Sequence, residues 1–265
     1  MRVFFVGFGQ TGGKIVDMFL EQDKKLPAQS FRGIAVNTAR TDLMGLKQIP
    51  IKDRILIGQT VVKGHGVGTD NVAGAKITAD EIDSIINAID TRGTHDVDAF
   101  VIAAGLGGGT GSGGTPVLAR HLKRIYREPV YTLGILPAPE EGRLYSYNAA
   151  RSLQTLAHEA DNTFLFDNSA WKNEGESVKS SYQRINDEIV RRAMLGRLTL
   201  PCDYSSAERA LLLIAGPPTE FDRKGVEKAK SWVEENISGV EVRGGDYPVD
   251  SSYIAAVVVL ATVRQ

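Results

Sequence analysis

Apolar and polar positions form a regular pattern along the first two thirds of the chain. Short apolar runs, each long enough for one buried strand, alternate with longer segments whose apolar residues recur at helical spacing. Strands that alternate with helices in this way are typical of an α/β fold with a doubly wound, mostly parallel sheet. The apolar runs predict strands at residues 2–6, 34–37, 54–57, 99–104, 130–136 and 164–166.

The segments between these runs predict the helices. Helical spacing of apolar residues covers residues 14–22 and 79–90. Thr115 and Pro116 have the residue types of an N-cap and a first helical turn, so we expect a third helix to begin there. This helix is expected to continue to about residue 126.

The last third of the chain has a different pattern. Residues 172–181 lack apolar periodicity and predict a loop, and residues 182–195 predict a helix. The end of the chain predicts strands at 211–215 and 254–262, with an amphipathic helix at 224–236 between them. These last elements predict a second, smaller α/β unit.

Two glycine-rich segments each lie between a predicted strand and a predicted helix. The first is residues 7–14, Gly-Phe-Gly-Gln-Thr-Gly-Gly-Lys, and the second is residues 107–114, Gly-Gly-Gly-Thr-Gly-Ser-Gly-Gly. Backbone N–H groups at the start of a helix bind anions, most often phosphates. Two such segments in one domain indicate a nucleotide site. A third glycine loop, residues 64–70, is less specific and could be an ordinary surface turn.

The first segment also allows a different interpretation. The spacing of Gly7, Gly9 and Gly12 matches the fingerprint of dinucleotide-binding proteins, which keeps a dehydrogenase open as an alternative. Such enzymes carry an acid at the end of the second strand to hold the ribose, and here that position is Asn37. The segment departs from a P-loop at both of its ends. Neither motif explains the second glycine segment.

Composition excludes several classes of protein. The net charge of −1 gives no electrostatic reason to expect nucleic acid or an anionic membrane surface as a partner. The single cysteine, Cys202, excludes an internal disulfide, and the four histidines show no metal-ligand spacing. No apolar run approaches the roughly 20 residues of a membrane span. We therefore expect a cytoplasmic protein.

The second glycine segment carries a resemblance to a known family. Residues 107–113 resemble, with no substitution, the phosphate loop of the tubulin and FtsZ superfamily. With residues 10–13 added, the chain most resembles the archaeal branch called CetZ. The resemblance covers nearly the whole chain in order. It continues through residues 37–38, 64–70, 140–143, 167–168 and 182–186.

The resemblance implies a fold and a ligand. It implies a GTP-binding domain at residues 1–181, a central helix and connection at 182–206, and a smaller α/β domain at 207–265. It also implies GTP or GDP as the bound nucleotide, with Mg²⁺ held through the nucleotide phosphates. Amides suit the guanine edge because they offer both a donor and an acceptor.

Individual roles are carried over position by position. The implied phosphate site consists of Gln10, Thr11, Gly12, Gly13 and Lys14, which also support Mg²⁺, and of Gly109, Thr110 and Gly111. Asn37, Gly108 and Ser112 are further implied nucleotide-binding residues. Gly66 and Gly68 belong to the loop implied to sense the γ-phosphate. The implied ribose contact is Glu141. The implied guanine contacts are Asn168 and Asn186, with Tyr182 stacking on the ring.

The family implies a cytoskeletal GTPase that controls cell shape. Its subunits stack head to tail into a homopolymer and hydrolyse GTP slowly at the interface, where an acidic loop of the next subunit enters the site. Partners that tether the polymer to a membrane are left unknown. A GTP-binding filament protein without hydrolysis is a further alternative.

The chain departs from the family at two places. Shortly after Asn186 it reaches residues 191–201, a stretch that lies several dozen residues further on in relatives. The acidic loop and the following helix are therefore missing, with a junction near residues 189–192, and no catalytic acid is identified. We favour a segment omitted from the sequence over a truly short protein. At Ala39, FtsZ relatives often carry an acid, which leaves the magnesium-linked carboxylate unassigned.

Overall fold

The computed structural model forms two compact units, Met1–Asp187 and Glu188–Gln265. It describes residues 2–26, 29–167, 204–216, 230–231, 233–235, 237–239, 241–248 and 255–261. The predicted loop at 172–181 and the predicted helix at 182–195 lie outside these residues, so the three-part division of the chain stays a prediction.

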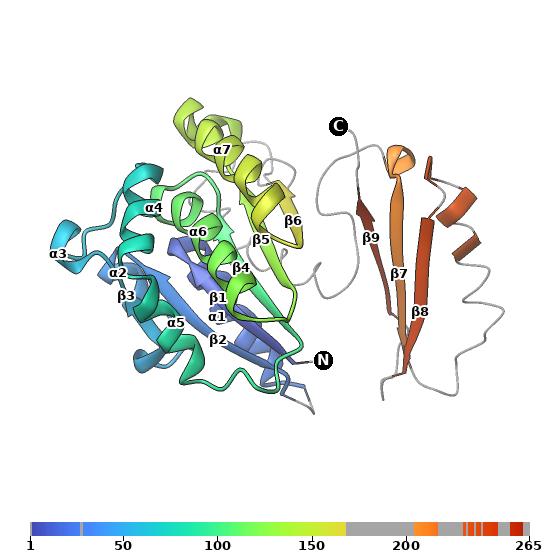
Figure 1. The fold of residues 1–265 in the computed structure, drawn as a ribbon, viewed down its shortest axis with the longest axis horizontal. Coiled ribbons are helices and arrows are strands. Elements are labelled where there is room, and N and C mark those ends of the chain that lie inside the picture. Colours follow the sequence, from blue (N-terminus) through green and yellow to red (C-terminus); the bar gives the residue numbers. More distant parts are fainter. Residues whose placement is uncertain are drawn as a thin grey trace. The chain divides into compact units, whose positions relative to one another are not determined.

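The first unit is built on a six-stranded sheet with the strand order β3-β2-β1-β4-β5-β6 (Figure 1). All neighbouring strands pair in parallel, which confirms the doubly wound parallel sheet predicted from the sequence. The strands are β1 (Val3–Phe8), β2 (Phe31–Asn37), β3 (Arg54–Leu56), β4 (Ala99–Gly105), β5 (Val130–Leu136) and β6 (Asn162–Asp167).

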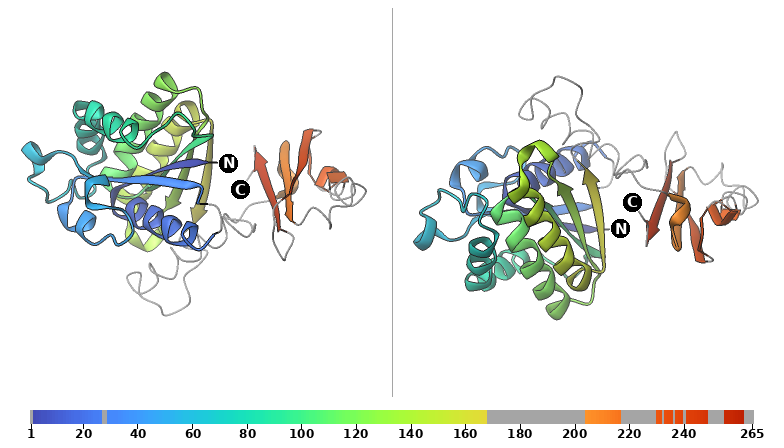
Figure 2. Two further views of the ribbon diagram at one scale, coloured as in Figure 1. Left: turned by 90° about the horizontal axis from the view of Figure 1, so that it is seen from below. Right: turned by 90° about the horizontal axis from the view of Figure 1, so that it is seen from above.

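Helices cover both faces of this sheet. Helix α1 packs on one face, and α4, α5, α6 and α7 lie on the other (Figure 2). The described helices of this unit are α1 (Gly9–Asp23), α2 (Arg40–Met44), α3 (Gln59–Val62), α4 (Asn71–Asp80), α5 (Ile82–Asp90), α6 (Gly109–Ile125) and α7 (Arg143–Glu159), with short 3₁₀ helices at Ile51–Asp53 and Pro139–Glu141.

The central strand β1 shows why its sequence is apolar throughout. Successive side chains of a strand point to opposite faces, and here both faces are covered. Phe4 is fully buried in the core beneath α4 to α6, where its ring centroid lies 5.9 Å from that of Phe100. Phe5 points the other way, with its ring centroid 4.9 Å from Phe19 of α1. All six residues of β1 are therefore buried.

Helix boundaries differ from those expected. The helix expected at 79–90 is mainly α5, because the chain breaks at Glu81, and its first two residues end a separate helix, α4, that the sequence did not predict. Helix α6 begins at Gly109, so Thr115 and Pro116 lie inside the helix and are not its cap. Helix α1 likewise begins at Gly9, before the expected residue 14.

Close packing explains why α6 extends into the glycine segment. A Cβ added at Gly113 would lie 2.1 Å from the Asn71 carbonyl oxygen, and one at Gly74 would lie 2.3 Å from the Gly109 carbonyl oxygen. Only glycine lets α4 and α6 approach this closely. Tertiary packing therefore outweighs the low helix propensity of glycine, about 1 kcal/mol per residue relative to alanine.

The second unit contains a three-stranded sheet with the order β8-β7-β9. Its strands are β7 (Arg209–Gly216), β8 (Glu241–Pro248) and β9 (Ala255–Ala261), preceded by a short 3₁₀ helix at Tyr204–Ser206. Strand β7 pairs in parallel with β8 and antiparallel with β9. The sequence did not predict β8, because its residues Glu-Val-Arg-Gly-Gly-Asp-Tyr-Pro lack an apolar run. Of the helix expected at 224–236, the structure describes only residues 230–231 and 233–235, which are helical.

Candidate functional site

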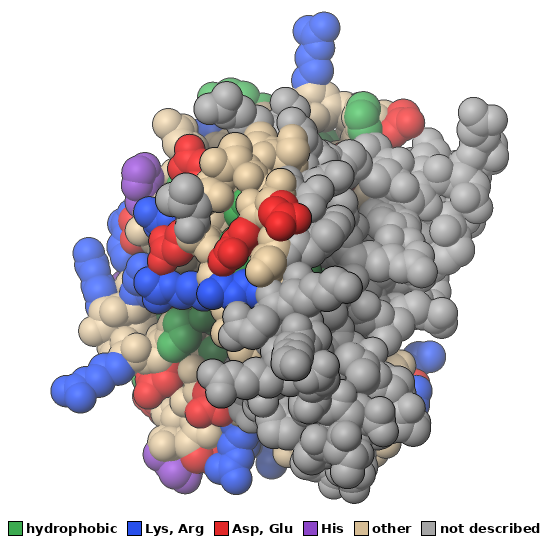
Figure 3. Space-filling view, turned by 90° about the vertical axis from the view of Figure 1, so that its right-hand side faces the viewer, with side chains coloured by type: hydrophobic (Ala, Val, Ile, Leu, Met, Phe, Trp, Pro, Cys, Tyr) green, Lys and Arg blue, Asp and Glu red, His purple; other side chains and the backbone are tan. Residues whose placement is uncertain are grey.

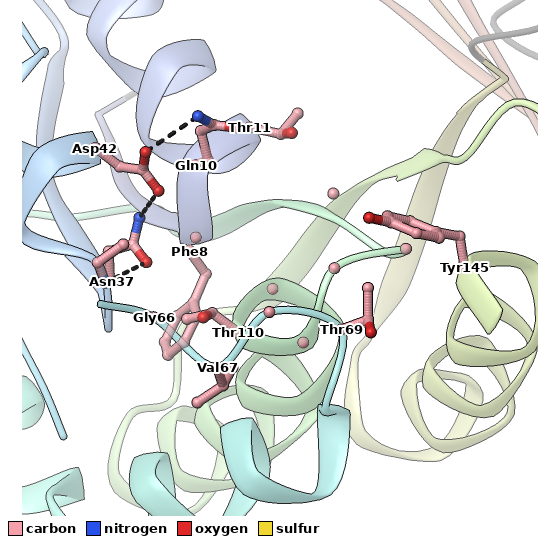
Figure 4. Close-up of a pocket in the computed structure, with 18 of the residues that line it drawn as sticks. Phe8, Gln10, Thr11, Asn37, Asp42, Gly66, Val67, Thr69, Thr110 and Tyr145 are labelled. Atoms are coloured by element: carbon pink, nitrogen blue, oxygen red, sulfur yellow. Dashed lines mark hydrogen bonds between the residues drawn. The ribbon is translucent and has the colours of Figure 1, made fainter. Parts of the chain in front are cut away.

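A cavity of about 380 Å³ lies at the carboxyl edge of the six-stranded sheet (Figure 4). Its wall includes the ends of β1, β2, β4 and β5. After β1 the chain crosses to β2 on one side, and after β4 it crosses to β5 on the other. Ligands of doubly wound sheets bind where the strand order reverses in this way. The volume lies within the range of small-molecule sites, roughly 300–1,000 Å³.

Two helices begin at this cavity. Helix α1 begins at Gly9 and α6 begins at Gly109, both residues line the cavity, and no side chain caps either helix. The first N–H groups of a helix lack intrahelical partners, and they carry the positive end of the helix dipole. The cavity therefore receives two positive helix ends, an arrangement that suits phosphate groups.

The glycines let these two helix ends meet. Gly9 has a φ of +72°, and a Cβ there would lie 3.1 Å from the backbone nitrogen of Gly111. A Cβ at Gly111 would lie 2.4 Å from the carbonyl oxygen of Gly105. Gly108 differs, because a Cβ there would have no protein atom within 4 Å. The space beside Gly108 is left open to a ligand.

An acid that the sequence analysis did not name lies in one wall. The side-chain amide of Gln10 donates to one carboxylate oxygen of Asp42 over 3.0 Å, and that of Asn37 donates to the other over 3.1 Å (Figure 4). Asn37 also accepts a hydrogen bond from the backbone of Ala39. Asp42 thus supplies a carboxylate near the position where Ala39 lacks one. Its signal in the sequence is an acid in the first helical turn after β2.

Thr110, which lines the cavity, forms a buried pair of hydroxyl groups with Thr38, which lies outside the lining. The Oγ1 atoms of Thr38 and Thr110 lie 2.7 Å apart. Among the described residues, Lys14 and His65 bring basic side chains to the lining. Both side chains are exposed, so they reach the cavity from its rim.

The opposite wall comes from the segment after β5 and from α7. Glu141 lines the cavity, and its Oε1 accepts the backbone N–H of Ala138 over 2.8 Å. Tyr145 faces the cavity from the first turn of α7 (Figure 4). Its ring covers Gly107, where a Cβ would lie 2.8 Å from a ring carbon. The sequence analysis missed Tyr145, because only the packing of α7 brings it here.

The structure gathers most of the residues that the sequence pointed to. The predicted residues that line the cavity are Gln10, Thr11, Lys14, Asn37, Gly66, Gly68, Gly108, Gly109, Thr110, Gly111 and Glu141.

The remaining predicted residues do not line the cavity or lie outside the described residues. A Cβ at Gly12 would lie 1.9 Å from the Ala103 carbonyl oxygen, so this glycine packs α1 against β4. Gly13 faces Leu46, and the Ser112 hydroxyl donates to the Gly108 carbonyl. Asn168, Tyr182 and Asn186 belong to residues that the structure does not describe, and the guanine contacts stay a prediction.

Other kinds of site find little support in the part of the chain that the structure describes. It contains no group of three or more His, Cys, Asp or Glu side chains arranged to hold a metal ion. None of its helices has the length and apolarity to cross a membrane. On the face shown in Figure 3, acidic and basic side chains of the described residues lie side by side.

Comparison with known families covers both units. Residues 2–176 match the Tubulin/FtsZ family GTPase domain, and residues 188–265 match the C-terminal domain of tubulin-like CetZ. The chain is 43% identical to tubulin-like protein CetZ1 of Haloferax volcanii, with 99% of this chain and 88% of the relative covered. It is 35% identical to tubulin-like protein CetZ of Pyrococcus furiosus, with 92% of this chain and 66% of the relative covered.

Solved structures agree. The GDP-bound monomer of CetZ1 from Haloferax volcanii has a TM-score of 0.89 and 48% identity. The match covers 98% of this chain and 93% of the chain in that structure. The GTPγS-bound protofilament of CetZ2 from the same organism has a TM-score of 0.88 and 37% identity. The match covers 100% of this chain and 94% of the chain in that structure. The FtsZ dimer of M. jannaschii, at 19% identity and a TM-score of 0.75, shares the fold.

The alignment to CetZ1 is longer than the chain itself. It spans 349 positions, whereas the chain has 265 residues. At least 84 positions, the difference between these two lengths, therefore have no counterpart in this sequence.

Proposed function

Because the chain belongs to the tubulin-like CetZ branch of the tubulin/FtsZ family, we propose that its cavity holds a guanine nucleotide between successive subunits of a filament. The protein is a tubulin-like cytoskeletal GTPase. The observation that carries the nucleotide site is the meeting of two helix starts without side-chain caps, at Gly9 and Gly109, in one cavity. A cytoplasmic location fits this function.

We propose a direction for the nucleotide in the cavity. We place the phosphates over the starts of α1 and α6, where backbone N–H groups and the open space at Gly108 lie. The terminal phosphate points toward Asp42 and Gly66, and the ribose points toward Glu141 on the opposite wall. The guanine contacts proposed from the family are Asn168, Tyr182 and Asn186.

Competition between nucleotides tests the ligand. Purified protein is expected to bind a fluorescent GTP analogue, which GTP and GDP displace and NADH does not. Displacement by NADH alone would restore the dehydrogenase alternative. The structure offers that alternative no acid at the end of β2, because Asn37 there is buried and donates its amide to Asp42.

The donor set fits a magnesium ion bound through the phosphates. Mg²⁺ prefers carboxylate and other oxygen ligands together with nucleotide phosphates. Each Asp42 oxygen accepts one amide N–H in the structure, and a carboxylate oxygen can accept more than one contact. We propose that Asp42 faces the cation and that Gln10 and Asn37 hold its carboxylate in place. The cation would neutralise charge on the transferred phosphoryl group.

The Asp42→Asn variant tests this assignment. With Mg²⁺ present, we expect the variant to bind GTP at least about tenfold more weakly than the wild type, a difference of about 1.4 kcal/mol. Without Mg²⁺ the variant should bind GTP as tightly as the wild type or more tightly, because the carboxylate of the wild type then only repels the phosphates. Titration of GTP in Mg²⁺ and in EDTA measures both values.

Asp83→Asn provides the matched control, since Asp83 is an exposed acid in the first turn of α5. This control should keep the Mg²⁺ dependence of the wild type. Equal Mg²⁺ dependence in the Asp42 variant and the wild type would remove Asp42 from the cation site.

We also propose that hydrolysis needs a second subunit. Among the described residues that line the cavity, only Asp42 and Glu141 carry carboxylates, and both accept hydrogen bonds that hold them in the wall. The acid that positions the attacking water is therefore expected from a neighbouring subunit. Hydrolysis would then rest on positioning and charge stabilisation.

One observation favours a second candidate function. At least 84 positions of CetZ1 have no counterpart in this sequence, and residues 189–192 are where we expect the junction. A chain that truly lacks this segment would bind GTP and join filaments without hydrolysing it. GTP binding with no phosphate release at any protein concentration would support this candidate.

A further inference from the structure

A buried amide connects two segments of the cavity wall. Asn148 lies in α7 with 2% of its surface exposed. Its Nδ2 donates to the carbonyl oxygen of Thr69 over 2.8 Å and to that of Gly107 over 2.9 Å. An asparagine amide has two N–H donors, so both are used, each on a different segment of backbone.

The two segments come from different parts of the sequence. Residues 64–70 belong to the connection between α3 and α4, and residues 105–109 run from the last residue of β4 to the first residue of α6. Residues of both segments line the cavity. They also touch directly, since the Gly109 N–H donates to the Gly68 carbonyl over 2.8 Å. Asn148 therefore adds two side-chain hydrogen bonds where the two segments already share one backbone hydrogen bond.

Helix α7 supports this junction with a second side chain. Tyr145 precedes Asn148 by one helical turn and covers Gly107 with its ring. Residues three apart on a helix lie on the same face, so one face of α7 contacts the 105–109 segment twice. In this helix, Asn148 is the residue that also donates a hydrogen bond to the 64–70 loop.

Hydrogen-bond energetics makes this amide matter for loop motion. A hydrogen bond between neutral groups contributes modestly to stability, but a buried carbonyl left without a partner is costly. Loops held by few hydrogen bonds and packing contacts open locally before the whole domain unfolds. An amide that satisfies one carbonyl in each segment makes independent opening of either segment unfavourable.

We propose that Asn148 is a positioning residue that couples the 64–70 loop to the 105–109 segment, so that the two open and close as one unit around the nucleotide. The part concerning nucleotide retention rests on the proposed function of the cavity. The coupling of the two segments does not, because it follows from the two hydrogen bonds alone. Phosphates held by one segment are thereby retained by the other.

The test compares Asn148→Leu with the wild type and with Ser152→Ala. Leucine has a similar size and donates no hydrogen bond. Ser152 lies one turn further along α7, is equally buried, and its hydroxyl has no hydrogen-bond partner among the described residues. Ser152→Ala therefore removes a buried polar atom from the same helix without affecting the two segments.

The first measurement is hydrogen exchange of the nucleotide-free protein. In Asn148→Leu, amides of residues 64–70 and 105–109 should exchange at least about fivefold faster, with similar factors in both segments. The rest of the sheet should keep its protection, as should both segments in Ser152→Ala. Faster exchange in only one segment, or equally faster exchange across the whole domain, would contradict the proposed coupling. If the leucine variant does not fold, Asn148→Ala, which leaves room for water, gives the same readout.

The second measurement is the dissociation rate of a fluorescent guanine nucleotide. Asn148→Leu should release it about tenfold faster than the wild type, and Ser152→Ala at the wild-type rate. Coupled exchange without nucleotide binding in any variant would contradict the proposed function alone. Nucleotide binding with an unchanged release rate would contradict the retention role of Asn148.

Discussion

Gly108 lines the cavity with an empty side-chain position and, unlike Gly68, with a backbone conformation open to any residue. Gly12 lacks a side chain because the Ala103 carbonyl is too close, and Gly9 adopts a left-handed backbone. Gly108 has an ordinary φ of −77°, and a Cβ there meets no protein atom within 4 Å. The protein itself gives no steric reason for glycine at this position. A ligand that occupies the space gives one.

Gly108→Val separates ligand contact from folding. We expect the variant to keep the wild-type melting temperature within a few degrees and to bind GTP at least about tenfold more weakly, because the new side chain enters the phosphate site. Calorimetry of unfolding and of binding measures both quantities. Gly45→Val serves as a control, since Gly45 is exposed outside the cavity and its Cβ makes only ordinary contacts. Unchanged GTP affinity in Gly108→Val would place the phosphates elsewhere.

The residues that line the cavity could be predicted from the sequence where they belong to a local motif. The glycine segments placed Gln10, Thr110 and Gly111 correctly in the wall. Asp42 and Tyr145 could not be found in this way, because their positions depend on which elements pack together. The sequence also could not separate Gly12, which packs a helix, from the glycines that line the cavity.

At the scale of elements, two ion pairs join α6 to the chain around the end of α7. Arg120 of α6 contacts Glu159 over 2.7 Å, and Lys123 contacts Asp161 over 2.9 Å. The hydrogen bond from Arg120 holds the pKa of Glu159 below its usual value. Burial raises the pKa of Asp161, but the Val130 N–H and Lys123 outweigh this, and its pKa is lowered overall. Both pairs stabilise the packing of α6 only while the carboxyls are ionised.

Acid should therefore weaken this packing. A carboxyl whose pKa is lower in the folded state stabilises the fold above its unfolded pKa, and this contribution is lost as the pH falls through the folded pKa. Glu159→Gln should lower the urea midpoint of unfolding at pH 7. The corresponding loss in the free energy of unfolding should be under about 1 kcal/mol, because the ion pair is partly exposed. The difference from the wild type should shrink as the pH falls below the usual glutamate pKa of 4.5 and through the lower pKa of the folded state. A difference that stays the same from pH 7 into this acid range would exclude an electrostatic origin.

Prediction of the elements succeeded for strands with apolar runs and failed where packing overrides propensity. The strand at 130–136 was predicted with its observed bounds. Helix α6 begins seven residues early because α4 approaches its glycines, and a single-sequence pattern contains no information about that approach. Strand β8 was missed because its residues are mostly polar or glycine, and it forms by pairing with β7.

At the scale of the molecule, the parallel sheet explains how remote segments build one site. The carboxyl ends of β1, β2, β4 and β5 meet at the same edge, so loops separated by many residues share the cavity. The fold class followed from the alternation of strands and helices. The proposed use of the cavity between subunits does not follow from this alternation, because a single chain contains only one side of such a contact.

The most direct test of the account is GTP hydrolysis per subunit as a function of protein concentration. We expect turnover per subunit to rise with concentration as subunits assemble, because in the proposed mechanism a neighbouring subunit completes each cavity. Gly108→Val should show little turnover at any concentration. Turnover per subunit that stays constant from dilute to concentrated protein would contradict a site completed by assembly.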